Sequence, residues 1–296
     1  MTQQQTLART VNVTAPLAAA GIRVSGIVHR VFSQRTQPLI AWDIGPDDSA
    51  RDFTLAYGIT GELQEISTRM GNGFISMSEA LLSQLAEPLP ELDAVILAYH
   101  SPDLFHADVA GFYLSQRLPG SPVPWSVAET GPGAGFTALR ITDGMRRMGE
   151  LDHGALFVYD QNAAMSEPDD TVSAIPDAAV LLTVGGTGGA VVSDFIDART
   201  SEPGDPTAAG ALAAAMARHG VGTGPTAILT GAGLAAALAG TALADRVQVA
   251  DADAQSTGVW AALASRWPIS EPVLVADHDP VGGMFRSCLL CPEAGR

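Results

Sequence analysis

The fold is decided by GAGFTALRITDGMRRMG (133–149), a helix entered through glycines, and by GALFVYDQ (154–161), the apolar strand that follows it. The second half of the chain repeats the scheme with the glycine-led helix GVWAALASRW (258–267) and the apolar strand VLVAD (273–277). Strands that are apolar throughout are typical of a sheet covered on both faces. The repeat therefore predicts an internally duplicated α/β fold with helices over both sheets.

Working outward, the same patterns predict the remaining elements. Alternation of apolar and polar residues predicts a strand at 21–32, and apolar runs predict strands at 92–99, 177–184 and 226–230. A further strand is expected at 121–130. Helical spacing of apolar residues predicts helices at 77–87 and 106–118, and an alanine-rich helix after residue 230. The strand at 226–230 corresponds to the apolar run at 94–98 in the first half.

Composition excludes several classes of protein. The chain has 296 residues, of which 47% are hydrophobic and 16% are charged, so it is predicted to fold around a large core. All 16 basic residues are arginine, which excludes a lysine Schiff base and a P-loop lysine. The 32 acidic residues give a net charge of −16, which disfavours binding to nucleic acid or to anionic membranes.

The two cysteines, Cys288 and Cys291, lie in an apolar terminal strand and are interpreted as packed thiols. The N-terminus has no apolar core typical of a signal peptide, so a cytoplasmic location is expected. The uncharged stretch 220–244 contains Pro225 and six glycines, and we interpret it as a buried strand and helix rather than a membrane span. No cofactor and no metal site is expected.

The order and spacing of three segments resemble the ketoacyl synthase III branch of the thiolase superfamily. These segments are ELDAVILAYHSPD (91–103), WSVAETGPGAGFTAL (125–139) and GALFVYDQNA (154–163). The similarity extends to PDAAVLLTV (176–184) and VLVADHDPVGGMFRSCLL (273–290). It implies a thiolase-like, internally duplicated, five-layer αβαβα fold. We expect an N-terminal half at 1–200 and a C-terminal half at 201–296, forming one compact unit.

The resemblance also implies a catalytic cysteine at the N-terminus of the buried helix, where the helix dipole would favour a thiolate. Depending on the register, that position falls on Gly131 or Gly133, and neither carries a nucleophile. The family's histidine would fall at Thr230 or Gly231, and its asparagine would fall near Gln255. Loss of all three members predicts an abandoned catalytic site.

Two other residues remain as candidates for a replacement chemistry. Thr130 lies beside the turn that leads into the helix at 133–149, here called the elbow, and could accept an acyl group with the help of a histidine. His278 lies in ADHDPVGG (276–283), a segment that in the family approaches the floor of the active site. His100 and Asp103 are adjacent to a strand end and are expected to point in different directions, so they cannot form a relay by themselves.

The leading hypothesis is a non-catalytic subunit that pairs with a ketosynthase III-like partner containing an intact Cys-His-Asn set. The chain is similar to the cysteine-less subunit of the heterodimeric condensing enzyme that makes 2-alkyl-4-quinolones, which suggests secondary metabolism. Acyl-CoA or acyl carrier protein would be met through the complex. The alternatives are an acyltransferase or thioesterase of the same fold with a non-cysteine site, and a stand-alone ligand-binding protein. The expected interface residues are Phe105, His106, Phe112, Tyr113, Val123 and Val127.

Overall fold

The computed structural model describes residues 21–34, 37–38, 70–103, 109–128, 131–161, 177–201, 206–221, 226–250 and 254–293. Its strands are β1 (Arg23–Phe32), β2 (Gln37–Pro38), β3 (Met70–Gly71), β4 (Ala94–Tyr99), β5 (Val123–Ala128), β6 (His153–Asp160), β7 (Asp177–Gly185), β8 (Ala190–Arg199), β9 (Ala227–Thr230), β10 (Gln248–Val249), β11 (Val273–Asp279) and β12 (Met284–Pro292). Its helices are α2 (Phe74–Leu82), α3 (Ala110–Arg117), α4 (Gly133–Arg147), α5 (Ala208–Arg218), α6 (Ala232–Leu238), the 3-10 turn η3 (Ala244–Arg246) and α7 (Gly258–Ala264).

The strand order confirms the internal duplication. The main sheet runs β10-β9-β11-β12-β8-β1-β7-β6-β4-β5, so each half places its strands in the same relative order. In both halves the outer three strands are parallel (β5, β4 and β6; β10, β9 and β11), and the next strand inward reverses direction. The two halves join through a short antiparallel pairing of β1 with β8.

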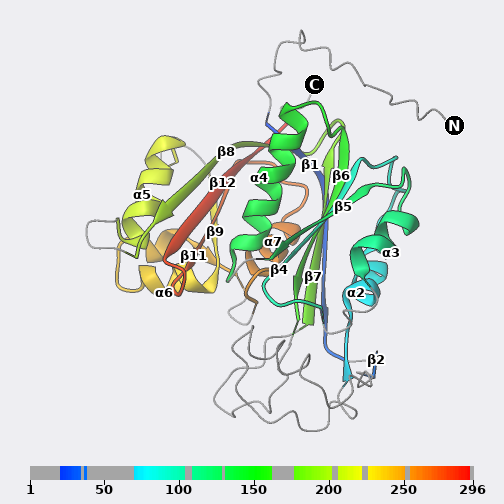
Figure 1. Cartoon of the computed structure of the whole chain (residues 1–296). Coiled ribbons are helices and arrows are strands. Elements are labelled where there is room, and N and C mark those ends of the chain that lie inside the picture. The colour runs from blue at the N-terminus through cyan, green and yellow to red at the C-terminus, as the bar shows by residue number, and fades with distance from the viewer. Residues whose placement is uncertain are drawn as a thin grey trace, which may run out of the picture.

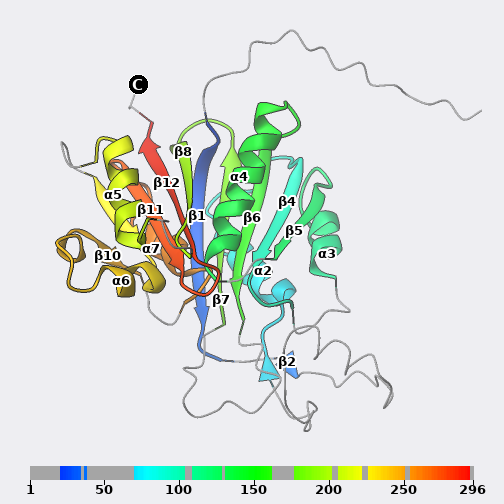
Figure 2. The ribbon, with the colours of Figure 1, turned by 60° about the vertical axis from the view of Figure 1, so that its left-hand side comes forward.

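Helices cover both halves of the sheet and also fill the space between them (Figure 1). Helices α2 and α3 pack on one outer side, and α5 and α6 pack on the other. Helix α4 contacts β4, β5 and β6 of the first half and also β11 and β12 of the second. Helix α7 contacts β1, β9 and β11, so α4 and α7 form the central layer. This is the expected five-layer αβαβα arrangement, seen from a second side in Figure 2.

Three apolar clusters hold these layers together. The central cluster joins strands of both halves to Phe136 of α4 and Trp260 of α7, whose ring centroids lie 4.9 Å apart. Gly135 permits this contact, because a Cβ there would lie 2.3 Å from the Trp260 ring nitrogen. The outer clusters lie under α2 and α3 and under α5 and α6. Burial of so much aliphatic side chain, at about 25 cal/mol per Å², is the main stabilising contribution.

The sequence predicted most of these elements, with shifted ends. The helix expected at 77–87 begins earlier, at Phe74, and ends at Leu82, before the Pro88–Pro90 turn. The strand expected to end at Asp277 continues to Asp279. The proposed division at residue 200 stays a prediction; the matching strand orders group β8 with the strands that follow it. Within the described ranges, no helix is long and apolar enough to cross a membrane.

Candidate functional site

The elbow that leads into α4 lies at the centre of the molecule. Gly131 has a φ of +60°, a backbone conformation that favours glycine. Its N–H donates to Nδ1 of His100 at 3.1 Å, and its carbonyl accepts from the Ser256 hydroxyl at 3.2 Å. Gly133 is buried in the first turn of α4. The elbow therefore joins β4 to the loop before α7, and the first half of the chain meets the second at this point.

An aspartate takes up the space beside Gly131. A Cβ built on Gly131 would lie 3.0 Å from Cγ of Asp279, which is tighter than an ordinary contact. Asp279 is 4% exposed and accepts a hydrogen bond from the N–H of Val281 at 2.9 Å. A side chain at position 131 would therefore require both a strained backbone and movement of this carboxylate.

At Gly231, one of the two places expected for the family's histidine, an aspartate also occupies the space that a side chain would need. It directly follows β9, and a Cβ built on it would lie 1.7 Å from Oδ2 of Asp277. Asp277 is 3% exposed, so its carboxylate has little room to move. Thr230 is fully buried, and its hydroxyl has no hydrogen-bond partner among the described residues. The place expected for a catalytic histidine is thus filled by a carboxylate from β11.

Burial dominates the electrostatics of Asp277. Loss of hydration raises the pKa of its carboxyl from 3.8 to about 7. The backbone N–H groups of His278 and Leu234 act in the opposite direction, while the nearby Asp279 raises the pKa further. Asp277 is therefore partly protonated near neutral pH. Among the described residues, no group of three His, Cys, Asp or Glu side chains could hold a metal ion.

His278 lies on β11 rather than in a turn, and it faces away from the elbow. Side chains alternate along a strand, so Asp277 and Asp279 share the central face with Val275, while His278 shares the outer face with Ala276. Its Nε2 lies 2.9 Å from the Thr200 hydroxyl, and burial lowers the pKa of the ring. The structure therefore does not bring His278 to Gly131 or Gly133. Thr130 lies outside the described residues.

The region expected to supply an asparagine instead fixes the start of α7. Gln255 is half-buried, and the next two residues bind Asp160 at the end of β6. Oδ1 of Asp160 accepts from the N–H of Ser256 at 2.8 Å, and Oδ2 accepts from the N–H and the hydroxyl of Thr257 at 2.8 and 2.6 Å. A carboxylate at a helix N-terminus is stabilised by the unpaired N–H groups there.

These contacts limit what the site can do chemically. The Ser256 hydroxyl is donated to Gly131, and the Thr257 hydroxyl is donated to Asp160. Because Nδ1 of His100 accepts a hydrogen bond from Gly131, that nitrogen carries no proton in this arrangement. The described elbow residues, Gly131 to Gly133, carry no side-chain hydroxyl or thiol that could act as a nucleophile.

Sequence reasoning missed Asp160, Asp277 and Asp279 as the residues that fill this site. The signal was available in part: both apolar strands end in aspartate, and the alternation along 273–279 places Asp277 and Asp279 on one face. His100 and Asp103 each form a described hydrogen bond with a different residue. Asp103 accepts from the N–H of Phe74 at 3.1 Å, whereas His100 contacts Gly131.

A second candidate site is the surface formed by α3 and the edge strand β5. Phe112, Val123 and Trp125 are 65%, 56% and 49% exposed, which is unusual for side chains of this size. Tyr113 is also partly exposed, whereas Val127 is buried in the central cluster. Phe105 and His106 lie outside the described residues.

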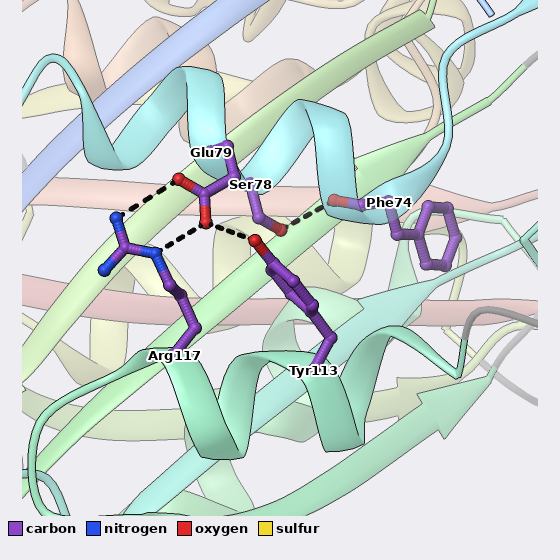
Figure 3. A network of polar contacts seen from close by, with 5 residues as sticks. All are labelled: Phe74, Ser78, Glu79, Tyr113 and Arg117. Carbon is purple, nitrogen blue, oxygen red and sulfur yellow. Dashed lines mark hydrogen bonds and ion pairs between the residues drawn. The ribbon is translucent and has the colours of Figure 1, made fainter.

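Polar contacts to α2 hold α3 in place (Figure 3). The Tyr113 hydroxyl donates to Oε1 of Glu79 at 2.9 Å, and Nε of Arg117 donates to the same oxygen at 3.0 Å. Tyr113 and Arg117 are four residues apart, so both side chains leave the same face of α3. Phe112 lies next to Tyr113 on α3 and is exposed beside these contacts.

Comparisons with known proteins establish the fold. The sequence matches no family model, and no curated protein is similar to it. The 3-oxoacyl-(acyl carrier protein) synthase III of Pseudomonas aeruginosa PAO1 is 14% identical with a TM-score of 0.60, and the match covers 93% of this chain and 99% of that one. OleA of Xanthomonas campestris, in complex with lauric acid and lauroyl-CoA, is 11% identical with a TM-score of 0.61, and covers 93% and 100%.

The chain therefore has a thiolase-like fold. It shares that architecture with ketoacyl synthase III and OleA structures. At identities of 11–14%, this similarity concerns the fold and not the activity.

Proposed function

We propose that the chain is a non-catalytic subunit of a heterodimeric, ketosynthase III-like acyl-condensing enzyme of secondary metabolism. Its partner would be a related chain that carries the cysteine, histidine and asparagine, and that receives the acyl group from acyl-CoA or acyl carrier protein. This chain would contribute a folded face to the partner and help shape its acyl pocket. We propose the cytoplasm as its location.

The observation that carries this proposal is the filled space at Gly231. An inactive enzyme that had lost only one side chain would leave room for it. Here the Asp277 carboxylate stands 1.7 Å from the position of any Cβ, and Asp279 similarly restricts Gly131. Both aspartates are buried, which supports a site whose packing leaves no room for the expected side chains.

The exposed apolar side chains on α3 and β5 support the pairing part of the proposal. Phe112, Val123 and Trp125 flank one end of the sheet. Aromatic residues of this kind commonly supply the central anchors of protein–protein interfaces.

Co-expression tests the proposal directly. The tagged chain is produced with the cysteine-bearing ketosynthase III-like chain encoded nearest to it, and the mass of the purified complex is measured by light scattering. We expect a 1:1 complex whose condensing activity is lost when the partner's cysteine is replaced by alanine. The proposal is contradicted if the two chains purify separately.

A second assay asks whether this chain reacts by itself. The purified chain is incubated with lauroyl-CoA while thiol release and protein mass are followed. We expect no release above the uncatalysed rate and no acyl adduct. An adduct on any side chain would overturn the non-catalytic assignment.

One contact favours the alternative, an acyltransferase or thioesterase with a non-cysteine site. A histidine beside a hydroxyl can act as its general base, and Nε2 of His278 lies 2.9 Å from the Thr200 hydroxyl. If lauroyl-CoA is consumed, loss of that activity in both Thr200→Ala and His278→Ala would locate it at this pair. Loss in Thr130→Ala would locate it at the elbow instead.

A further inference from the structure

The backbone of β5 offers an unusual set of hydrogen-bonding groups at the edge of the sheet. Within the described part of the chain, β5 is the last strand beside β4. The N–H of Val123 donates to the carbonyl of Asp93 at 2.9 Å, and Val123 pairs with Ala94 in the parallel register. Polar groups alternate in direction along a strand, so those of Pro124, Ser126 and Ala128 point away from β4.

Prolines remove donors from this open edge. Pro124 has no N–H, and neither does Pro122, the preceding residue with the same orientation. The carbonyl of Pro122 already accepts a hydrogen bond from the Ser115 hydroxyl at 2.6 Å. Within β5 the edge therefore offers three carbonyl acceptors but only two N–H donors, those of Ser126 and Ala128.

Apolar side chains flank the same edge on both faces. One face of β5 carries Val123, Trp125 and Val127, and Val127 packs in the central cluster. On the other face, Gly111 of α3 packs against Pro124, and Phe112 is exposed on that helix. Figure 2 shows α3 beside β5 at the end of the sheet. Large apolar groups on both sides favour an edge that is covered by protein rather than left in water.

A second copy of this chain would form poor backbone hydrogen bonds with the β5 edge. An antiparallel pair centred on Ser126 would place each Ala128 carbonyl opposite a Pro124 that has no N–H. A pair centred on Trp125 would place Ser126 opposite Pro124 and Ala128 opposite Pro122. A pair centred on Val127 avoids the prolines, but leaves only two residue pairs within β5. Buried carbonyls without donors are costly, and two-fold symmetry doubles each defect.

The net charge of the chain also disfavours a homodimer. Each copy carries a net charge of −16, so two copies repel each other as they approach. A strand from a different chain can supply an N–H opposite Ala128 and can belong to a less acidic protein. In that pairing a single carbonyl lacks a donor, namely the partner's carbonyl opposite Pro124, which has no N–H.

We propose that Pro122 and Pro124 make the β5 edge reject a second copy of this chain and accept a strand from a different chain. This partner is expected to pair antiparallel to β5 and to carry no proline opposite Ala128. The inference rests on the proposed function for the existence of a partner, and it names the residues that keep the pairing heterodimeric.

The test compares the whole chain with its Pro122→Ala/Pro124→Ala double variant, each without a partner. Sedimentation velocity measures self-association, and hydrogen–deuterium exchange follows the amides of Ser126 and Ala128. We expect the wild-type chain to be monomeric with fast exchange at both amides. The double variant should dimerise at least about tenfold more tightly, with both amides protected.

Two controls keep the outcome interpretable. Pro88→Ala/Pro90→Ala changes two prolines in the exposed loop before β4 and should leave self-association unchanged. Pro124→Ala alone restores one donor and should give an intermediate effect if the double variant folds poorly.

Three results would overturn the inference. They are a wild-type homodimer with protected Ser126 and Ala128 amides, protection of these amides in a wild-type monomer, and a folded double variant that stays monomeric. None of these depends on the partner, whereas the proposed function fails only in the co-expression and lauroyl-CoA experiments.

Discussion

Single residues decide that this site does not hold the expected catalytic groups. Gly131 and Gly231 follow strands β5 and β9, where related positions were expected to carry reactive side chains. Each glycine contacts a buried aspartate from β11, Asp279 and Asp277 respectively. At both positions the absence of a side chain and the place of the neighbouring aspartate are thus linked by packing.

Replacing Gly231 with alanine should be costly only while Asp277 is present. The new Cβ would overlap the carboxylate, so we expect Gly231→Ala to lower the free energy of unfolding by about 2–3 kcal/mol. In an Asp277→Gly background the same change should cost much less. Urea denaturation of the four proteins measures this coupling.

Gly144 supplies the matched control for this cycle. It lies within α4 with nothing within 4 Å of its Cβ position, so Gly144→Ala should be neutral or stabilising by up to about 1 kcal/mol. A large cost for Gly231→Ala in both backgrounds would contradict the proposed overlap.

Asp277 should make the protein less stable as pH rises through the mildly acidic range. Its pKa is raised from 3.8 to about 7, so the folded state retains a proton that the unfolded state has lost between these values. Relative to Asp277→Asn, stability should fall by up to about 1.4 kcal/mol per pH unit from about pH 4 to pH 7, and then level off.

Denaturation midpoints at several pH values check this expectation. Asp245→Asn, at an exposed position in η3, serves as the control and should keep the wild-type profile. Equal pH profiles for the wild type and Asp277→Asn would show that the carboxyl titrates normally.

At the scale of elements, the ends of strands fix the starts of helices. Asp160 lies at the end of β6 and binds Ser256 and Thr257, directly before α7 in the other half of the chain. Gly131 and Ser256 add a second link between the same regions. Together these hydrogen bonds connect the N-terminal ends of α4 and α7, the two helices of the central layer.

Removing Asp160 should therefore disturb the junction between the halves. Asp160→Ala deletes three hydrogen bonds to a buried carboxylate, and we expect a loss of about 3 kcal/mol in the free energy of unfolding. Thr207→Ala, which removes an exposed cap bond of 3.1 Å at α5, should cost only about 1 kcal/mol. Similar losses for the two variants, measured by thermal and urea unfolding, would argue against a special role for Asp160.

At the scale of the whole molecule, the two ends of the sheet differ. Strand β5 ends the first half beside exposed Phe112 and Trp125, whereas β10 ends the second half with a strand of only two residues. The duplicated fold is therefore symmetric in strand order but not in its edges. This difference is the basis for placing the partner at β5.

Charged substitutions at the two edges should separate binding from folding. Phe112→Asp and Trp125→Asp should each weaken the proposed heterodimer by about tenfold or more, with an unchanged melting temperature of the isolated chain. Val249→Asp, at a half-exposed position on β10, should leave the affinity unchanged. Titration calorimetry compares the three, and equal weakening by all of them would refute an interface at β5.

The sequence by itself determined the fold class and its duplication. Long apolar strands and glycine-led helices follow from local periodicity, which depends only on nearby residues. The absence of a nucleophile at Gly131 and Gly133 was also readable directly. The faces of β11 were partly readable, because alternation separates His278 from its neighbours once the strand is known to reach Asp279.

Only the tertiary structure decided what replaced the missing groups. Asp279 lies 148 residues from Gly131 and Asp277 lies 46 residues from Gly231, and no local pattern connects them. The same holds for the open edge of β5, because strand order depends on long-range pairing. Local propensity specifies elements, whereas the contacts that fill a site or expose an edge arise only when distant segments pack together.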